Sequence, residues 1–345
     1  MGRMNRVPRT VPFALGAAAV AAGAAFAARR SHVADRERLR DRVVVIVGGS
    51  RGLGYALAED LARGGARVTI AGRDATILER ARQRLAEGGL IVDALRCDAR
   101  VASEAEALIA HVEANSGPVD VLVNDLGAIE VGSVWDQALD DFRESVETHV
   151  FGPLHTMRAV LPSMRARRAG RIVNISSIGG LIGVPHLAPY CTGKFGLTGL
   201  SQAYAAELAA DGITVTLVCP GLMRTGSPDR AIFKGRARAE YTWFALLGSN
   251  PLVSASTRHA VVRIVRAIAR RERFVPITVF ARLAPIANAL APTLTALVLG
   301  LMARALPPPA HDERVRQTGE ESHTPLAPSI LTALDRLAKR RNNEE

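Results

Sequence analysis

The stretch VVVIVGGSRGLG, residues 43–54, joins a run of apolar β-forming residues to three spaced glycines. Five branched aliphatic residues in a row are typical of a buried parallel strand. Glycines at its carboxyl end allow positive φ angles and a close approach of the backbone to a ligand. Residues 55–65, YALAEDLARGG, then show helical spacing and end in two glycines. A strand, a glycine turn and a helix aim free N–H groups at an anion. A plain turn needs one glycine rather than three, so the stretch predicts a phosphate-binding turn.

The composition indicates a globular chain with a sizeable core. The chain has 345 residues, of which 48% are hydrophobic, and this length fits one large domain or two small ones. Its net charge of +11 is uneven, because residues 1–42 hold nine arginines and three acidic residues. No nucleic-acid-binding motif accompanies the basic charge, so we expect no nucleic acid as partner. The cysteines indicate a reducing compartment rather than a disulfide framework, and no Cys/His cluster has metal-ligand spacing. They are odd in number and lie in apolar surroundings: Cys97, Cys191 and Cys219.

Residues 11–28, VPFALGAAAVAAGAAFAA, carry no charge and are flanked by arginines on both sides. At about 1.5 Å per residue, a helix of this length nearly crosses the roughly 30 Å hydrocarbon core of a bilayer. Residues 1–40 are therefore predicted to be an uncleaved transmembrane anchor with its basic flank. A cleaved signal peptide and a disordered or self-packed tail are the alternatives. Because basic flanks stay in the cytoplasm, the denser arginine cluster after the stretch predicts a membrane-associated protein whose catalytic domain is cytoplasmic. The alternative is a cytoplasmic protein.

Between residues 41 and 276, short β-runs alternate with helical stretches. The β-runs include RVTIAG, VDVLVND, GRIVNISS and ITVTLVCPG. This alternation predicts an α/β fold, a doubly wound parallel sheet of about seven strands with helices on both faces.

The chain after residue 276 divides into an apolar and a polar part. Residues 277–306 form a C-terminal apolar helical extension, uncharged from Leu283 to Met302 and interrupted by Pro285 and Pro292. The prolines argue against one straight spanning helix. A helix lying on the membrane, or lining an apolar substrate entrance, and a packed helix of the same core are the open alternatives. Residues 307–345 are predicted to be a loose polar tail with one short helix.

Polar signals recur at the ends of the predicted strands. The segment YCTGK, residues 190–194, places Tyr190 and Lys194 four residues apart, on one face of a helix. Ser177 closes a strand thirteen residues before Tyr190. The strand-end segments are AGRD (71–74), RCD (96–98), NDLG (124–127), NISS (174–177) and PGLMRT (220–225). Together with the glycine turn, this set resembles the short-chain dehydrogenase/reductase family over residues 43–225.

The resemblance implies a Rossmann-like oxidoreductase that interconverts a secondary alcohol and a ketone or aldehyde by hydride transfer. The alkoxide formed by hydride transfer must gain a proton, and Tyr190 is placed as that acid/base. A phenol, with an ordinary pKa near 10, needs a stabilised phenolate, which the ammonium of Lys194 favours. The hydroxyl of Ser177 can hold the carbonyl oxygen beside Tyr190. By resemblance, Lys194 also binds the nicotinamide ribose.

The expected cofactor is NADP(H), with NAD(H) as a possible substitute. NAD-binding sheets usually carry an acidic residue at the end of the second strand; here Gly72 stands there and Arg73 follows. A guanidinium pairs with a 2′-phosphate, and Arg51 in the glycine turn adds a second positive charge. By resemblance Asp98 contacts the adenine and Thr225 the carboxamide. The full predicted cofactor set is Gly48, Ser50, Arg51, Gly52, Leu53, Gly54, Arg73, Asp98, Asn124, Tyr190, Lys194, Pro220, Gly221 and Thr225.

The sequence departs from the family pattern at three places. Val47 replaces a threonine, and Asn124 is followed by Asp125 and Leu126 where the family has Asn-Ala. The helix asparagine that helps to relay protons to the lysine falls at His149. An imidazole can also donate and accept, so the relay is either altered or broken. The alternative function is thus a catalytically impaired relative that serves as a nucleotide-dependent sensor or scaffold.

Two apolar segments flank the predicted site in the sequence. We therefore expect a lipophilic carbonyl or alcohol substrate that enters from a membrane, and a homo-oligomer is possible.

Overall fold

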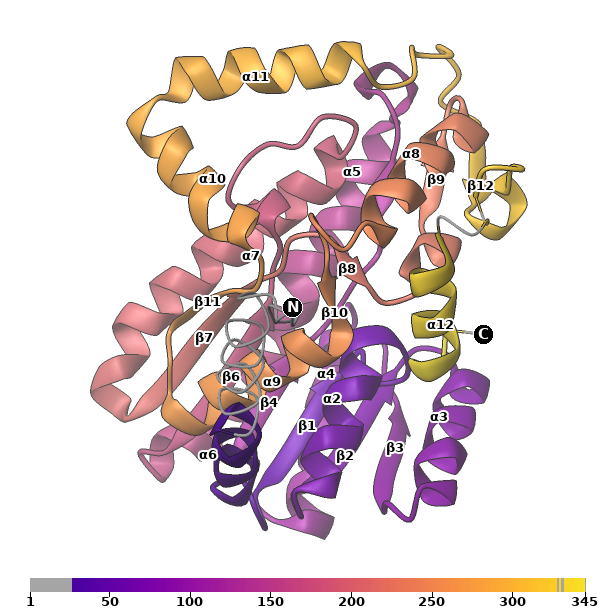
Figure 1. Ribbon diagram of the computed structural model, residues 1–345. Helices are drawn as coiled ribbons and strands as arrows, with labels where there is room; N and C mark the ends of the chain where they lie inside the picture. The colour runs from indigo at the N-terminus through magenta and orange to yellow at the C-terminus, as the bar shows by residue number, and fades with distance from the viewer. Residues whose placement is uncertain (1–26, 328, 330–331, 345) are drawn as a thin grey trace, which may run out of the picture.

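A computed structural model describes residues 27–327, 329 and 332–344. Its centre is a seven-stranded parallel sheet in the order β11-β7-β6-β4-β1-β2-β3 (Figure 1). This confirms the predicted doubly wound sheet. The strands are β1 (Val43–Val47), β2 (Arg67–Gly72), β3 (Val92–Arg96), β4 (Val121–Asn124), β6 (Gly170–Ile175), β7 (Ile213–Cys219) and β11 (Phe274–Pro276).

Helices cover both faces of the sheet. Helices α2 and α9 pack on one face together with α3, and α4 and α6 pack on the other. Helix α7 also lies on the second face, and α5 packs against it. The helices are α2 (Gly52–Arg63), α3 (Ala75–Glu87), α4 (Ala102–Ser116), α5 (Leu139–Val146), α6 (Gly152–Ala166), α7 (Ala188–Glu207), α8 (Ala237–Ser249) and α9 (Thr257–Arg270).

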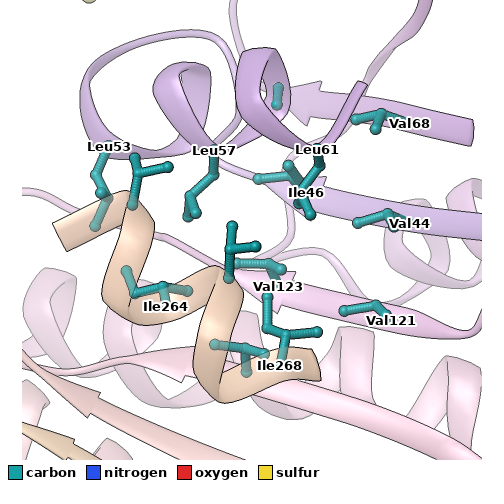
Figure 2. Close-up of a cluster of buried hydrophobic side chains, with 14 of the residues drawn as sticks. Val44, Ile46, Leu53, Leu57, Leu61, Val68, Val121, Val123, Ile264 and Ile268 are labelled. Atoms are coloured by element: carbon teal, nitrogen blue, oxygen red, sulfur yellow. The ribbon is translucent and has the colours of Figure 1, made fainter. Parts of the chain in front are cut away.

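The apolar run of β1 serves both faces at once, because side chains alternate along a strand. Val44 and Ile46 contribute to the core under α2 and α9, and the other three valines to the core under α4 and α6. Figure 2 shows Ile46 pointing between Leu61 of α2 and the residues of α9. The continuous hydrophobic pattern is therefore explained by burial on two sides.

The strand order reverses direction between β1 and β4. The first three strands run outward from β1 on one side, and β4, β6, β7 and β11 follow on the other. In open parallel sheets, ligands bind outside the carboxyl ends of the strands at such a point. The glycine turn after β1 stands at this place.

Two small sheets lie beside the main one. One pairs β8 (Met223–Arg224) with β10 (Ala255–Ser256), and the other joins β5 (Glu130–Val131), β9 (Ile232–Lys234) and β12 (Arg316–Thr318). The second sheet brings the chain after residue 306 back against the body, where β12 pairs with β9.

Residues 27–37 are helical and pack on the body. The ring of His32 lies 3.1 Å from Asp60 on α2, and Arg270 on α9 pairs with Asp35 at 3.0 Å. Nearly all of the predicted anchor, residues 11–28, lies outside the described residues. Within the part of the chain that is described, no helix has both the length and the apolar character needed to cross a bilayer.

The second apolar region forms two helices, α10 (Val279–Leu290) and α11 (Pro292–Arg304). Pro292 is the first residue of α11, a position that proline favours because an N–H there would have no partner within the helix. Pro285 lies inside α10. Ala281 is the one buried residue of α10, and α11 has none. Figure 1 shows α11 at the top of the view, clear of the sheet. This arrangement does not match a packed helix of the core.

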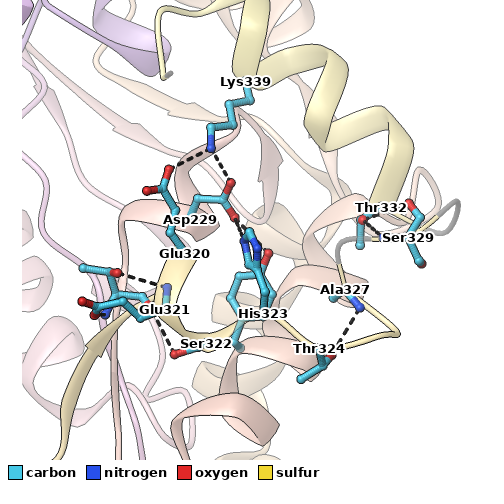
Figure 3. A network of polar contacts seen from close by, with 12 residues as sticks. Asp229, Glu320, Glu321, Ser322, His323, Thr324, Ala327, Ser329, Thr332 and Lys339 are labelled. Carbon is cyan, nitrogen blue, oxygen red and sulfur yellow. Dashed lines mark hydrogen bonds and ion pairs between the residues drawn. The ribbon is translucent and has the colours of Figure 1, made fainter.

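The expectation of a loose tail after residue 307 is wrong. Strand β12 pairs with β9, and α12 (Ala333–Arg341) packs against α8. Lys339 of α12 contacts Asp229 at 2.7 Å and Glu320 at 3.0 Å (Figure 3). Polar composition suggested a solvated segment, but these charges are paired with groups of the domain and with one another.

Candidate active site

The glycine turn makes close backbone contacts with β2 and with the loop after β4. The N–H of Gly48 donates to Ala71 of β2 at 2.8 Å, and a Cβ at Gly48 would collide with the carbonyl oxygen of Asp125 after β4. A Cβ at Gly54 would likewise collide with the carbonyl of Gly48. Gly52 has a φ of +58°, which favours glycine. The three glycines that the sequence singles out are thus required by backbone contact or conformation.

The start of α2 offers N–H groups to an anion. Arg51 is the N-cap, in an extended conformation, and its side chain does not cap the helix. Leu53 is buried in the core below, so it can reach a ligand only through its backbone. The first N–H groups of a helix need an external acceptor. Arg51 also brings a guanidinium to this place, which favours a phosphate.

Ser177, Tyr190 and Lys194 come together at the carboxyl edge of the sheet. Ser177 follows β6, and Tyr190 and Lys194 lie on the first turns of α7. The hydroxyl of Ser177 hydrogen-bonds Tyr190, and Nζ of Lys194 lies 5.7 Å from the centre of the Tyr190 ring. Lys194 is anchored by donating to the carbonyls of Ile175 at 2.8 Å and Leu126 at 3.2 Å.

The pKa values of Tyr190 and Lys194 are shifted in one direction by burial and in the other by neighbouring polar groups. Burial raises the pKa of Tyr190, and the hydrogen bond from Ser177 works in the opposite direction. Burial lowers the pKa of Lys194, while the carboxylate of Asp125 raises it again. Asp125, whose own pKa is raised by burial, therefore supports the charge on Lys194. Asp125, which departs from the family pattern, thus places a carboxylate where it influences the pKa of Lys194.

His149 lies on a one-turn π-helix, Glu147–Phe151, between α5 and α6. Its ring meets Tyr190 edge to face at 5.4 Å, and burial lowers its pKa well below the usual value. Nδ1 lies 3.0 Å from the carbonyl of Ser145, which can only accept, so we assign the proton to Nδ1. Nε2 is then a buried acceptor with no hydrogen-bond partner among the described residues.

The predicted cofactor residues line the edge from β3 to β7. Arg73 lies within electrostatic range of both Arg51 and Asp98. Pro220 accepts the N–H of Ile178 at 2.6 Å, which ties the loop after β7 to the Ser177 turn. Gly221 packs against Thr278, and Thr225 bonds Ser227 at 2.7 Å.

Asn124 has a different environment from the rest of the predicted cofactor set. Its amide is fully buried, donates to Asn174 at 2.9 Å and accepts from Thr156 at 2.7 Å. The side chain thus joins β4, β6 and α6 beneath the site. Asp98 is held by Arg100, which forms a two-pronged pair with it at 2.6 and 3.0 Å. Sequence reasoning missed Arg100, although its spacing of two from Asp98 was a signal.

A small pocket opens beside Tyr190 and is also lined by Ala128, Ser145, Glu130 and Glu144. Arg316 on β12 pairs with Glu130 at 3.2 Å and with Glu144 at 2.8 Å. Burial raises the pKa of Glu130 to about 7. These acids were not predicted, because nothing in the sequence indicates that β12 returns to this side.

A family model described as short chain dehydrogenase matches residues 42–231, more than half of the chain. The chain therefore belongs to the short chain dehydrogenase family, and it is an oxidoreductase that acts on CH–OH groups.

Relatives match more than half of the chain. A Streptomyces coelicolor protein with "ketoacyl reductase" in its name is 40% identical over 185 residues, 53% of this chain and 71% of that protein. The "Dehydrogenase/reductase SDR family protein 7-like" of Anopheles gambiae is 33% identical over 259 residues, 73% of this chain and 78% of that protein. The solved structure of a short-chain dehydrogenase from Streptomyces avermitilis is 29% identical, has a TM-score of 0.65, and covers 76% of this chain and 98% of that one.

Proposed function

We propose that the protein is an NADP(H)-dependent oxidoreductase that interconverts a secondary alcohol and a ketone or aldehyde on a lipophilic substrate. The observation that carries the proposal is the meeting of Ser177, Tyr190 and Lys194 beside the glycine turn. The nucleotide fits this edge, since glycines without room for a Cβ, a helix start that has no side-chain cap and the guanidinium of Arg51 stand together there.

In this proposal Tyr190 moves the proton and its neighbours prepare it. When bound, the nicotinamide supplies or accepts the hydride. Ser177 holds the substrate oxygen next to the phenol, and Tyr190 gives that oxygen its proton. The ammonium of Lys194 stabilises the phenolate that remains. The free Nε2 of His149 is an acceptor for a water that would return the proton, which is the role we assign to this residue.

The preference for NADP(H) rests on charge at the end of β2. Arg73 is exposed there, directly after Gly72, and this glycine stands in the place where an acidic residue would repel a 2′-phosphate. Arg51 and Arg73 lie close enough for their charges to interact. Two guanidinium groups at the edge favour the phosphorylated cofactor.

A lipophilic substrate and a membrane location are supported by α10 and α11. Ten large apolar side chains of the pair are exposed: Val279, Phe280, Leu283, Ile286, Leu290, Leu294, Leu297, Val298, Leu301 and Met302. The large exposed side chains of α11 recur at the spacing i, i+3, i+4, i+7 and i+8 and so form one broad face, while the remaining residues up to Arg304 carry no charge, which suits a helix lying in a lipid surface. At about 20 Å, thirteen residues are too short to span a bilayer, so the pair would lie in its surface.

The position of α10 connects this surface to the chemistry. Helix α10 begins after Thr278, whose side chain packs on Gly221 at the carboxyl edge of the sheet. A substrate dissolved in the bilayer would thus be delivered close to Tyr190. The basic residues before Arg42 keep this catalytic domain on the cytoplasmic side in our proposal.

A nucleotide-dependent sensor is the second candidate, and Asp125 and His149 are the observations in its favour. The test is NADPH consumption with a panel of ketones and aldehydes of increasing chain length. The wild type should turn over the long apolar members, and Tyr190→Phe should lose that turnover while Tyr204→Phe, further along α7, keeps it. NADPH binding without turnover of any member would favour the sensor.

A further inference from the structure

The last residues of the described chain lie on the glycine turn. Asn342 accepts the N–H of Gly52 through its carbonyl at 2.8 Å, so it occupies one of the N–H groups at the start of α2. The amide of Asn343 donates to the carbonyl of Ser50 at 2.8 Å. Both asparagines are almost completely buried. Residues 342–344, which we term the plug, therefore contact the same turn that the phosphates would use.

Glu344 brings an acidic group to this place. Its Oε1 lies over Gly52, so that a Cβ added there would come within 2.8 Å of it. The side chain is 5% exposed. The cations that face it are Arg51 and Arg230, and the acids that face it from other elements are Asp335 and Asp125. An acid above Gly52 and beside Arg51 stands where a phosphate group would accept the same partners.

Further contacts reach both ends of the nucleotide site. Asn342 donates to the carbonyl of Thr225 at 3.1 Å and to the hydroxyl of Thr257 at 3.0 Å. The side-chain oxygen of Asn343 accepts from Arg80 and Arg84 of α3, each at 3.2 Å. The plug thus bridges the loop after β7, the glycine turn and α3.

Helix α12 holds the plug in place. Asp335 accepts the N–H of Gly226 at 3.0 Å, and Lys339 pairs with Asp229 and Glu320. Figure 3 shows Lys339 reaching down from α12 toward Asp229. Most of these partners are loop or surface groups, and α12 contributes no residue to the hydrophobic clusters of the sheet. The segment can leave without opening the core.

We propose that the plug is an internal competitor of the nucleotide: it closes the phosphate turn in the free protein and must withdraw, with α12, before the cofactor binds. The proposal rests on the nucleotide site of the proposed function. A site that is closed in nine molecules of ten binds its ligand about tenfold more weakly than an open one. The fraction of molecules in which α12 and the plug are docked would then set the cofactor concentration that the enzyme needs.

The test compares NADPH binding, followed by nucleotide fluorescence, in the full chain and in a chain ending at residue 328. The shortened chain should bind about tenfold or more tightly. The double variant N342A/N343A should shift in the same direction, and N115A, the same change at an exposed site on α4, should not. Circular dichroism checks that each variant is folded.

Limited trypsin digestion gives a second readout in the full chain. Saturating NADPH should speed cleavage after Lys339–Arg341, since α12 must detach. Equal or weaker binding by the folded shortened chain, or protection of α12 by NADPH, would overturn the competitor and make the segment a lid. Absence of NADPH binding in every variant, the shortened one included, would overturn the nucleotide site itself.

Discussion

The positive charge of Lys194 depends on the neighbouring carboxylate of Asp125, which opposes the effect of burial on the pKa of the ammonium. The buried ammonium has a lowered pKa, and the carboxylate of Asp125 is the largest influence that raises it. In the proposed mechanism, Tyr190 donates its proton readily only while this ammonium is charged. The site therefore has a built-in sensitivity to alkaline pH that depends on the acid.

Asp125→Asn should shift the alkaline limb of the carbonyl-reduction rate to lower pH by about one unit. The sign follows because removal of a negative charge lowers the pKa of Lys194 further, so the ammonium is lost earlier as pH rises. The measurement is kcat against pH for wild type and variant. Asp93→Asn, an exposed position on β3, is the control. An unmoved limb would show that Asp125 does not support Lys194.

Arg73→Ala should weaken NADPH binding by about tenfold to a hundredfold and leave NADH nearly unchanged. The reason is loss of a charge-assisted contact of about 1.5–3 kcal/mol, at about 1.4 kcal/mol per decade. Titration of both cofactors measures it, with Arg63→Ala on the exposed side of α2 as control. An equal loss for the two cofactors would refute the role of Arg73.

Residue types indicated the chemistry better than they indicated side-chain direction. Tyr190 and Lys194 were predictable as a pair because helical spacing fixes their common face. Asn124 was predicted to bind cofactor, yet its amide points into the core toward Asn174. A strand residue's face depends on register, which only the paired neighbours decide.

At the scale of elements, α10 and α11 expose an apolar surface that is unfavourable in water. They expose long apolar side chains over two consecutive helices, with no acidic or basic residue between Arg282 and Arg304. Monomeric soluble proteins rarely expose a contiguous apolar surface of this kind. The prolines in the sequence predicted an interrupted helix, but the degree of exposure needed the structure.

Leu297→Gln combined with Leu301→Gln should reduce binding to phospholipid vesicles several-fold, because two exposed apolar side chains of α11 would no longer enter the lipid. The thermal midpoint should stay unchanged, since α11 has no buried residue. Vesicle sedimentation measures the first and calorimetry the second. Ile91→Gln, an even more exposed apolar residue outside the pair, is the control. Unaltered vesicle binding would remove α11 from the membrane contact.

At the scale of the whole molecule, the parallel sheet was predictable and the course of the last 40 residues was not. Apolar runs separated by helical spacing carry a local signal for each βα unit. The return of β12 to β9 and of Asn342 to Gly52 depends on contacts between residues far apart in sequence. Polar residues such as Asn342 and Asn343 show no periodicity that would reveal their burial.

The central claim is that this fold transfers hydride to a carbonyl whose oxygen is protonated by Tyr190. Single-turnover reaction of excess enzyme with NADPH deuterated at the transferable C4 position, and with a long-chain ketone from the panel, tests it most directly. The account predicts deuterium on the carbinol carbon of the product at stoichiometric yield. Tyr190→Phe should slow its appearance by about a hundredfold or more while NADPH still binds. Deuterium transfer at an undiminished rate in Tyr190→Phe, or none from the bound cofactor to any carbonyl in the wild type, would contradict the account.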